Sequence, residues 1–209
     1  MIKNKSVIVT GAASGIGSAC ARRLLADGNR VVAVDLDRER LVAELGDETD
    51  ALKFAAGDVA RTATADRAAK TAVDAFYTID GLAHFAAAHS KLNWESADED
   101  EFNRILSTNV TGSFLMAKAA AKVMIDQGVK GAMVLTASGG VLMGGTGENG
   151  RGGPAYTTSK GGVLVLVRTL AKSWGKYGIR VNAISPGVVE TAMTSEYSDE
   201  AMEGAAARA

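Results

Sequence analysis

The stretch TGAASGIG, from Thr10 to Gly17, decides the fold class of this chain. The apolar run SVIVT leads into it, and a helical pattern of apolar residues begins directly after it. A glycine turn between a strand and a helix is typical of dinucleotide-binding folds, in which the helix N-terminus faces the pyrophosphate. The alternative is a turn that serves only to reverse the chain.

Each glycine of this turn has an expected purpose. Gly11 permits the tight turn, Gly15 lets the backbone approach a pyrophosphate, and Gly17 allows the helix to pack closely on the strand. We therefore expect a dinucleotide to contact Gly11, Ser14, Gly15, Ile16 and Gly17.

Apolar, β-branched runs alternate with helical stretches along the rest of the chain. The runs of strand length cover residues 6–10, 30–34, 51–55, 79–85, 132–136 and 179–184. The helical stretches cover residues 16–26, 38–45, 63–75, 99–125 and 155–176. This alternation predicts an α/β fold, a doubly wound, Rossmann-type parallel sheet with helices on both faces. Because no repeat or linker divides the sequence, we expect residues 1–209 to form a single dinucleotide-binding and catalytic domain.

The composition argues against several function classes. The 209 residues carry a net charge of -1 with 22% charged residues, which offers no positive field for nucleic acid or for an anionic membrane surface. No apolar stretch approaches the length of about 20 residues that a membrane-spanning helix needs. Cys20 is the only cysteine, so an internal disulfide and a cysteine-rich metal site are impossible. We expect no metal, no nucleic-acid or membrane partner, and a reducing, cytoplasmic location.

Asp35 ends the second apolar run, RVVAVD, eighteen residues after Gly17. An acidic side chain at this distance from a glycine turn accepts hydrogen bonds from the adenosine ribose of NAD. A carboxylate would repel the 2'-phosphate of NADP, and neither Ser14 nor Leu36 supplies a cation for it. The sequence thus favours NAD, the alternative being that Asp35 is a surface or helix-capping residue. Asp37 is better placed to cap the helix that follows.

Tyr156 and Lys160 lie four residues apart in AYTTSKGG, at the start of a predicted helix, so their side chains share one face. A free phenol has a pKa of about 10, and a neighbouring ammonium favours the phenolate and lowers that value. Tyr156 can then exchange a proton with a substrate oxygen near neutral pH. The alternative is a tyrosine and a lysine on the surface of one helix.

In their order along the chain, these motifs resemble those of the short-chain dehydrogenase/reductase family. The resemblance runs from Ser6 to about Thr191. TGAASGIG is similar to that family's TGxxxGxG turn, and YTTSK is similar to its YxxxK active-site helix. LTAS, which ends in Ser138, looks like the end of the family's fifth strand, and STNVTGSF resembles the helix that carries its asparagine, here Asn109.

The resemblance implies the catalytic residues Ser138, Tyr156, Lys160 and Asn109. In the family, the serine and tyrosine hold the substrate oxygen, and the asparagine supports a water-linked proton path through the lysine. The alternative for Asn109 is a helix-kink or packing residue. Further cofactor contacts are implied at Asp58, Val59, Ala86, Tyr156, Lys160, Pro186, Gly187, Val189 and Thr191.

The activity that this resemblance implies is hydride transfer between NAD(H) and a secondary alcohol or ketone, a small-molecule substrate. Tyr156 is the general acid and base, Ser138 steadies the charge on the substrate oxygen, and Lys160 lowers the tyrosine pKa. The family also implies a homo-oligomer, a tetramer or dimer. Two alternatives are a nucleotide-binding regulatory protein with little turnover and a sugar-nucleotide epimerase or dehydratase. The chain lacks residues for the separate substrate domain of the last class.

The sequence departs from the family after the fourth strand, where NNAG is usual and this chain has HFAA at residues 84–87. His84 either forms the backbone bond of the usual asparagine through a ring nitrogen or leaves the site altered. For His84, and for His89 on the following loop, a structural histidine is the alternative to a catalytic one.

Two segments are expected to shape the substrate entrance. Residues 139–154 form a glycine-rich active-site loop, in which Val141, Leu142 and Met143 either line an apolar pocket or face solvent. Residues 192–209 form a partial substrate lid. The final strand of the family has no counterpart in the sequence, so either the natural chain continues or another segment protects the edge of the sixth strand.

Overall fold

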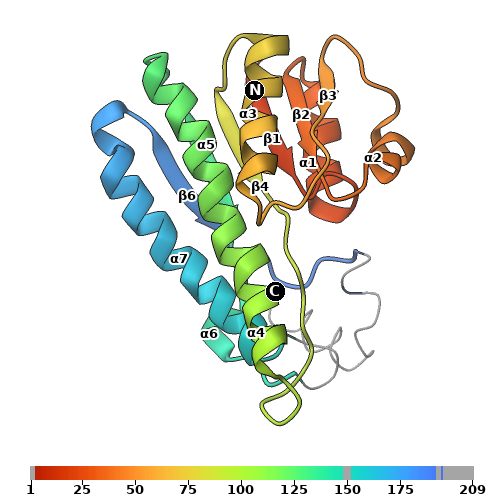
Figure 1. The fold of residues 1–209 in the computed structure, drawn as a ribbon, viewed down its shortest axis with the longest axis vertical. Helices are drawn as coiled ribbons and strands as arrows, with labels where there is room; N and C mark the ends of the chain where they lie inside the picture. The colour runs from red at the N-terminus through yellow and green to blue at the C-terminus, as the bar shows by residue number, and fades with distance from the viewer. Residues whose placement is uncertain (1–2, 148–151, 192–193, 195–209) are drawn as a thin grey trace.

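The computed structural model describes residues 3–147, 152–191 and 194. Within these residues, six strands form one parallel sheet with helices on both faces (Figure 1). The strands are β1 (Ser6–Thr10), β2 (Arg30–Val34), β3 (Leu52–Phe54), β4 (Gly81–His84), β5 (Ala132–Thr136) and β6 (Arg180–Ile184). Their spatial order, β3-β2-β1-β4-β5-β6, is that of a doubly wound Rossmann fold. The predicted fold class is confirmed.

Helices cover the sheet in two layers, each with its own apolar core. On one face, α1 (Gly15–Ala26) and α2 (Arg38–Leu45) pack against Val7 and Val9 of β1. On the other, α3 (Thr62–Phe76), α5 (Gly112–Asp126) and α7 (Pro154–Trp174) lie side by side over Ile8 of the same strand (Figure 1). Successive strand side chains point to opposite faces, so a sheet covered on both faces needs apolar residues at nearly every position.

The single helix predicted at residues 99–125 is divided into three parts. α4 (Glu99–Leu106) is followed by a π-helical turn, η1 (Ser107–Thr111), and then by α5. A π turn inserts one residue into the helical repeat and leaves the apolar pattern on both sides intact, so the sequence period does not reveal it. Asn109 is buried in this turn, and a helical irregularity therefore does occur at the position of this asparagine.

The segment at 139–154, predicted as a loop throughout, contains a short helix, α6 (Gly140–Met143). The loop prediction was wrong for these residues, because the glycine-rich composition of the segment favours a loop although its apolar residues form one helical turn. α7 begins at Pro154, where the fixed φ of proline suits the first helical turn and its missing N–H costs nothing. The helix passes at its end into a 3-10 turn, η3 (Gly175–Tyr177).

Since all six strands are parallel, the segments that follow them meet at one edge of the sheet. β6 pairs with β5, and within the described ranges no strand lies along its other edge. No helix in the described part of the chain combines the length and apolar character needed to cross a membrane.

Candidate active site

A cavity of about 1080 Å³ is lined by the segments that follow β1, β2, β4, β5 and β6, where ligands bind in open parallel sheets. Of the predicted catalytic residues, Ser138, Tyr156 and Lys160 line it, and Asn109 does not. All predicted cofactor residues line it: Gly11, Ser14, Gly15, Ile16, Gly17, Asp35, Asp58, Val59, Ala86, Tyr156, Lys160, Pro186, Gly187, Val189 and Thr191.

The glycine turn is as tight as its sequence predicts. Gly11 and Gly15 have positive φ angles of 67° and 53°, which side chains rarely tolerate. A Cβ on Gly11 would lie 2.8 Å from the backbone nitrogen of Ala86, and a Cβ on Gly17 would overlap the carbonyl oxygen of Gly11. At Gly15 a Cβ would lie 3.0 Å from Cγ2 of Thr191, so the turn and the loop after β6 close on each other.

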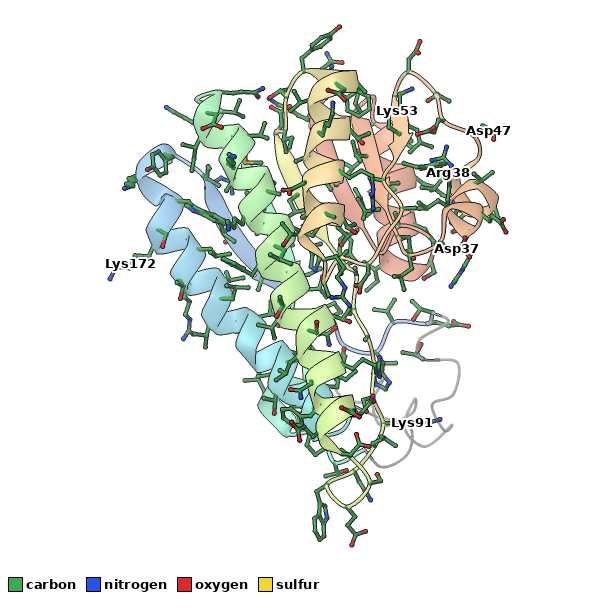
Figure 2. All side chains as sticks on the ribbon, in the orientation of Figure 1. Asp37, Arg38, Asp47, Lys53, Lys91 and Lys172 are labelled. Atoms are coloured by element: carbon green, nitrogen blue, oxygen red, sulfur yellow. The ribbon has the colours of Figure 1, made fainter. Side chains whose placement is uncertain are left out.

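Asp35 braces the glycine turn from the end of β2. Its Oδ2 accepts a hydrogen bond from the backbone N–H of Ala13 at 3.0 Å, and its Oδ1 accepts one from the N–H of Leu36 at 2.8 Å. Each oxygen keeps a further lone pair for a ribose hydroxyl. Asp37, labelled at the start of α2 in Figure 2, caps that helix by accepting bonds from two N–H groups of its first turn. The predicted cap is confirmed, and Asp35 is not a helix cap.

Arg40 lines the cavity together with Asp35, a feature that sequence reasoning missed. Arg40 is exposed on the first turn of α2 and forms no ion pair with any described residue, whereas Arg38 pairs with Glu48 at 2.8 Å. The sequence prediction of NAD rested on Ser14 and Leu36, neither of which is a cation. The predicted cap at Asp37 could have revealed Arg40, because a helix that begins there places its first turn beside the end of β2.

The hydroxyl of Thr10 connects the glycine turn to the loop after β4. Its oxygen accepts hydrogen bonds from the backbone N–H groups of Phe85 at 3.1 Å and Ala86 at 3.0 Å, and it also bonds Nδ1 of His84. Burial, with a smaller effect of the Lys160 charge, lowers the pKa of His84 to about 3. His84 is therefore neutral at pH 7 and does not line the cavity. It bonds through a ring nitrogen to a side chain, where a backbone bond was expected.

Lys160 is a buried cation next to the predicted acid/base residue. Its Nζ donates a hydrogen bond to the carbonyl oxygen of Thr136 at 2.9 Å and lies 5.7 Å from the centre of the Tyr156 ring. Burial lowers the pKa of Lys160 to about 8, so the ammonium form still predominates at pH 7. A positive charge in this low-dielectric position favours a phenolate nearby.

Ser138 follows β5 and lies beside the loop that follows β6. Its Oγ accepts a hydrogen bond from the N–H of Gly140 at 3.2 Å, which leaves the hydroxyl proton for another acceptor. The backbone N–H groups on either side of Ser138 donate to the carbonyl oxygens of Ile184 at 2.8 Å and Pro186 at 3.0 Å. These bonds fix the serine relative to the loop after β6.

Asn109 braces the site from behind the cavity. Its Oδ1 accepts a hydrogen bond from the N–H of Ala88 at 2.8 Å, and its Nδ2 donates to the carbonyl oxygen of Ala88 and to Oγ of Ser159, both at 2.9 Å. Ser159 in turn donates to the carbonyl oxygen of Tyr156 at 2.6 Å. The side chain thus joins the loop after β4 to the first turn of α7. The water-linked proton path stays a prediction.

His89 lies on the loop after β4 with its ring against Tyr156. The two ring centroids are 4.8 Å apart with an interplanar angle of 61°, an edge-to-face arrangement. Neither of the two alternatives for His89, structural or catalytic, predicts this contact, because it joins the loop after β4 to the first turn of α7, which is distant in sequence.

The substrate side of the cavity is only partly apolar. Met143 lines it, whereas Leu142 is 92% exposed and Val141 is absent from its lining. The expectation of an apolar pocket is therefore met by one of the three residues. The predicted lid, residues 192–209, lies outside the described residues except for Thr194, which lines the cavity.

Comparison with known proteins identifies the family. A family model described as short chain dehydrogenase matches residues 5–202. The chain belongs to the short-chain dehydrogenase/reductase family. One family member, short-chain dehydrogenase reductase 3c of Arabidopsis thaliana, is 37% identical over 197 residues, which cover 93% of this chain and 74% of that protein.

Two further members of the short-chain dehydrogenase/reductase family extend this likeness. D-threitol dehydrogenase of Mycolicibacterium smegmatis is 37% identical over 193 residues, which cover 91% of this chain and 72% of that protein. The crystal structure of a short-chain dehydrogenase/reductase, glucose/ribitol dehydrogenase, from Brucella melitensis superposes with a TM-score of 0.84 at 28% identity, covering 93% of this chain and 77% of that one. Membership in the family makes this chain an oxidoreductase of CH–OH groups that uses NAD or NADP.

Proposed function

We propose that this chain is an NAD-dependent dehydrogenase/reductase that interconverts a secondary alcohol and a ketone, with Tyr156 as its general acid and base. One observation carries the proposal. The buried Nζ of Lys160 lies 5.7 Å from the Tyr156 ring centre, and both residues line the cavity that Ser138 and the glycine turn also line. Cofactor binding alone needs no serine and tyrosine in that wall.

The residues of this cavity fit a nicotinamide dinucleotide. At Gly11 a Cβ would collide with the backbone of Ala86, so only glycine allows the turn to keep this tight form. Gly11, Gly15 and Gly17 line the cavity and present main chain to a ligand, as a pyrophosphate requires. Gly11, Gly15 and Gly17 would hold the pyrophosphate and Asp35 the adenosine ribose. The loop from Pro186 to Thr191 would hold the carboxamide. When bound, the nicotinamide takes up the hydride from the substrate carbon or returns it.

In this proposal, side chains of the protein itself carry out the proton transfer. In the oxidation direction, Tyr156 removes the hydroxyl proton of the substrate, and in reduction it returns that proton to the oxygen. Ser138 donates a hydrogen bond that stabilises the charge developing on this oxygen. The Lys160 ammonium favours the phenolate form of Tyr156, since opposite charges attract strongly in a buried site.

NAD is the proposed cofactor because Asp35 places a carboxylate where NADP carries a phosphate. A second candidate is NADP, which the exposed guanidinium of Arg40 in the same wall favours. Asp35 outweighs Arg40 in this proposal, since its carboxylate is fixed by two backbone N–H groups whereas Arg40 extends from a helix surface.

We propose a small polyol or a related hydroxy compound as the substrate. The cavity wall carries the hydroxyl groups of Thr108 and Thr157 and the guanidinium of Arg104, all able to bond several substrate hydroxyls. The relative named D-threitol dehydrogenase supports this choice of substrate class.

The decisive experiment is a turnover assay with purified protein. NAD and NADP are each mixed with tetritols, pentitols, simple secondary alcohols and hydroxyacyl thioesters, and absorbance of the reduced cofactor is followed. Tyr156→Phe should abolish turnover and leave cofactor binding intact, while Tyr177→Phe, at a tyrosine in η3, should match the wild type. NAD binding without any turnover would favour the alternative of a nucleotide-binding regulatory protein.

The domain organisation, assembly and location are proposed as the sequence predicts them. Residues 1–209 form one unit, with the glycine-rich segment 139–154 beside the active site and 192–209 as a partial lid. The side chains of Phe114 on α5 and Val165 on α7 are exposed, which supports a homo-oligomer that pairs these helices. Sedimentation analysis tests the assembly, and fractionation of the producing cell tests the cytoplasmic location.

A further inference from the structure

The loop after β4 is held at three consecutive residues by three different elements. The backbone of Ala88 is held by η1 at both its N–H and its carbonyl oxygen. The carbonyl oxygen of His89 accepts a hydrogen bond from Nη2 of Arg104 in α4 at 3.4 Å. The carbonyl oxygen of buried Ser90 accepts one from the N–H of Gly153, at the start of α7, at 2.8 Å. The loop therefore has little freedom to shift.

The arginine that holds His89 is itself fixed. Its Nε donates to Oε2 of Glu101 at 2.7 Å, and its Nη2 donates to Oε1 of the same carboxylate at 2.9 Å. Such paired, charge-assisted bonds fix the plane of the guanidinium. Arg104, which bonds the backbone of His89, and Ala88, which precedes His89 in the sequence, both line the cavity. His89 is thus presented to Tyr156 from a rigid support.

The contact between His89 and Tyr156 meets the geometry of a favourable aromatic pair. The centroid separation of 4.8 Å and the interplanar angle of 61° lie within the edge-to-face range. The same phenol ring has the Lys160 Nζ 5.7 Å from its centre. The backbone of Tyr156 is fixed as well, since Oγ of Ser159 donates a hydrogen bond to its carbonyl oxygen. These backbone hydrogen bonds do not themselves restrict rotation about the side-chain bonds of Tyr156.

We propose that His89 is a positioning residue for Tyr156: the imidazole ring restricts rotation of the tyrosine side chain about its Cα–Cβ bond and so keeps the phenol hydroxyl in one direction within the cavity. The effect on rate rests on the proposed function of Tyr156, whereas the effect on the side-chain rotamer does not. A general acid or base must be held at hydrogen-bonding distance from its substrate, so a tyrosine that leaves this rotamer reacts less often. The contact acts through ring shape and needs no proton on the imidazole.

Three variants of His89 separate a ring contact from a hydrogen-bonding role. His89→Phe keeps a flat ring without nitrogen atoms, His89→Asn keeps polar atoms without a ring, and His89→Ala keeps neither. We expect His89→Phe to retain the wild-type kcat, and His89→Ala and His89→Asn to lower kcat about three- to tenfold, the worth of one aromatic pair. The dissociation constant of the reduced cofactor should stay the same in all three. In a Tyr156→Phe background, His89→Ala should change the residual rate no further.

A second measurement observes the ring directly and needs no turnover. With ¹³C,¹⁵N-labelled tyrosine, the signals of Tyr156 are assigned by their loss in Tyr156→Phe, and three-bond couplings from the backbone nitrogen and carbonyl carbon to Cγ give the population of each rotamer about the Cα–Cβ bond. The wild type and His89→Phe should occupy one rotamer, whereas His89→Ala and His89→Asn should populate more than one. Tyr77, which is 79% exposed, serves as the internal control and should be unaffected.

The outcomes are distinguishable. Tyr156 rotamer populations that are unchanged in His89→Ala overturn the proposal, and so does a loss of kcat in His89→Phe as large as that in His89→Ala. If no substrate turns over but the rotamer populations follow the ring at position 89, the proposed function fails and the positioning contact stands.

Discussion

The hydroxyl of Thr10 lies 2.9 Å from Nδ1 of His84, and this contact fixes the proton of a buried histidine. The hydroxyl oxygen already accepts two backbone N–H groups, so its single proton is donated to Nδ1. The ring proton of His84 then resides on Nε2, which has no hydrogen-bond partner among the described residues. We predict the neutral Nε2–H tautomer at pH 7, to be read from the ¹⁵N chemical shifts of the ring. An Nδ1–H signal would contradict this prediction.

The same histidine should make the protein sensitive to acid. The pKa of His84 is about 3 in the folded chain, against about 6.5 for a free imidazole, so only the unfolded state takes up a proton between these values. Stability is therefore complete above about pH 6.5 and falls as pH drops toward about 3. At pH 4 the loss from this group is about 3 kcal/mol. Urea unfolding at pH 7 and pH 4 measures it.

His84→Asn, which restores the residue usual in the family, is the matched variant for that experiment. The other titrating groups are common to both proteins, so the difference between the two pH profiles isolates His84. The difference should grow as pH falls from 6.5 to 4. Parallel profiles for the two proteins would show that His84 is protonated in the folded state.

Removing the buried ammonium of Lys160 should lower the activity and should not lower the free energy of unfolding. We predict that Lys160→Met lowers kcat/KM by about a hundredfold or more, because Tyr156 loses the charge that favours its phenolate. Its free energy of unfolding at pH 7 should equal or exceed that of the wild type. The folded pKa of about 8, below the ordinary 10.5, means that burial of the charge opposes folding by about 3 kcal/mol at that pH. Steady-state kinetics and urea unfolding are the two measurements.

Lys172 supplies the control on the same helix, since its side chain points outward from α7 (Figure 2). Lys172→Met should leave both kcat/KM and unfolding unchanged. For the wild type, the cost of burying Lys160 disappears as pH rises from about 8 to 10.5, because the folded protein releases its proton first. That rise should be missing in Lys160→Met, and its persistence there would assign it to another group.

Cofactor choice should depend on opposing charges at Asp35 and Arg40. Asp35→Asn should weaken NADH binding about tenfold, since one charged hydrogen-bond acceptor for the ribose is lost. Arg40→Gln should weaken NADPH binding and leave NADH binding unchanged, because only NADPH brings a phosphate. Fluorescence titration of the wild type and both variants with each reduced cofactor measures the six dissociation constants. Tighter NADPH than NADH binding that survives Asp35→Asn would overturn the assignment of NAD.

The brace at Asn109 should be needed for folding. Asn109→Leu removes three hydrogen bonds and leaves the backbone N–H and carbonyl of Ala88 unpaired, for an expected loss of about 2 to 4 kcal/mol. Asn103→Leu, at an exposed asparagine of α4, should stay within about 0.5 kcal/mol of the wild type. Thermal or urea unfolding compares the three proteins, and equal stability of the two variants would mean that water replaces the brace.

The features that the sequence predicts correctly have local causes. The apolar, β-branched side chains of SVIVT are by themselves enough to predict a strand that is covered on both faces. Gly11 is likewise explained by its own backbone, because its φ angle is positive. The cap at Asp37 is local in the same way, because its carboxylate bonds the next turn of its own chain.

The features that the sequence does not reveal join distant positions. Thr10 and His84 are 74 positions apart, and nothing in either neighbourhood specifies the other. The edge contact of His89 with Tyr156 likewise depends on how the loop after β4 meets the start of α7 once the sheet has formed. The π turn around Asn109 is local but leaves the apolar period intact.

The start of α7 is held from behind, by Gly153 bonded to Ser90 and by Lys160 bonded to Thr136 of β5. The tyrosine proposed as catalytic on this helix thus owes its place to the loop after β4 and to the sheet, and the glycine-rich segment contributes its last residues, Gly152 against the tyrosine ring and Gly153 at the helix cap. Exchanging residues 146–151 for segments of other lengths would then reshape the cavity wall that Thr146 lines and leave the bonds that support the start of α7 in place.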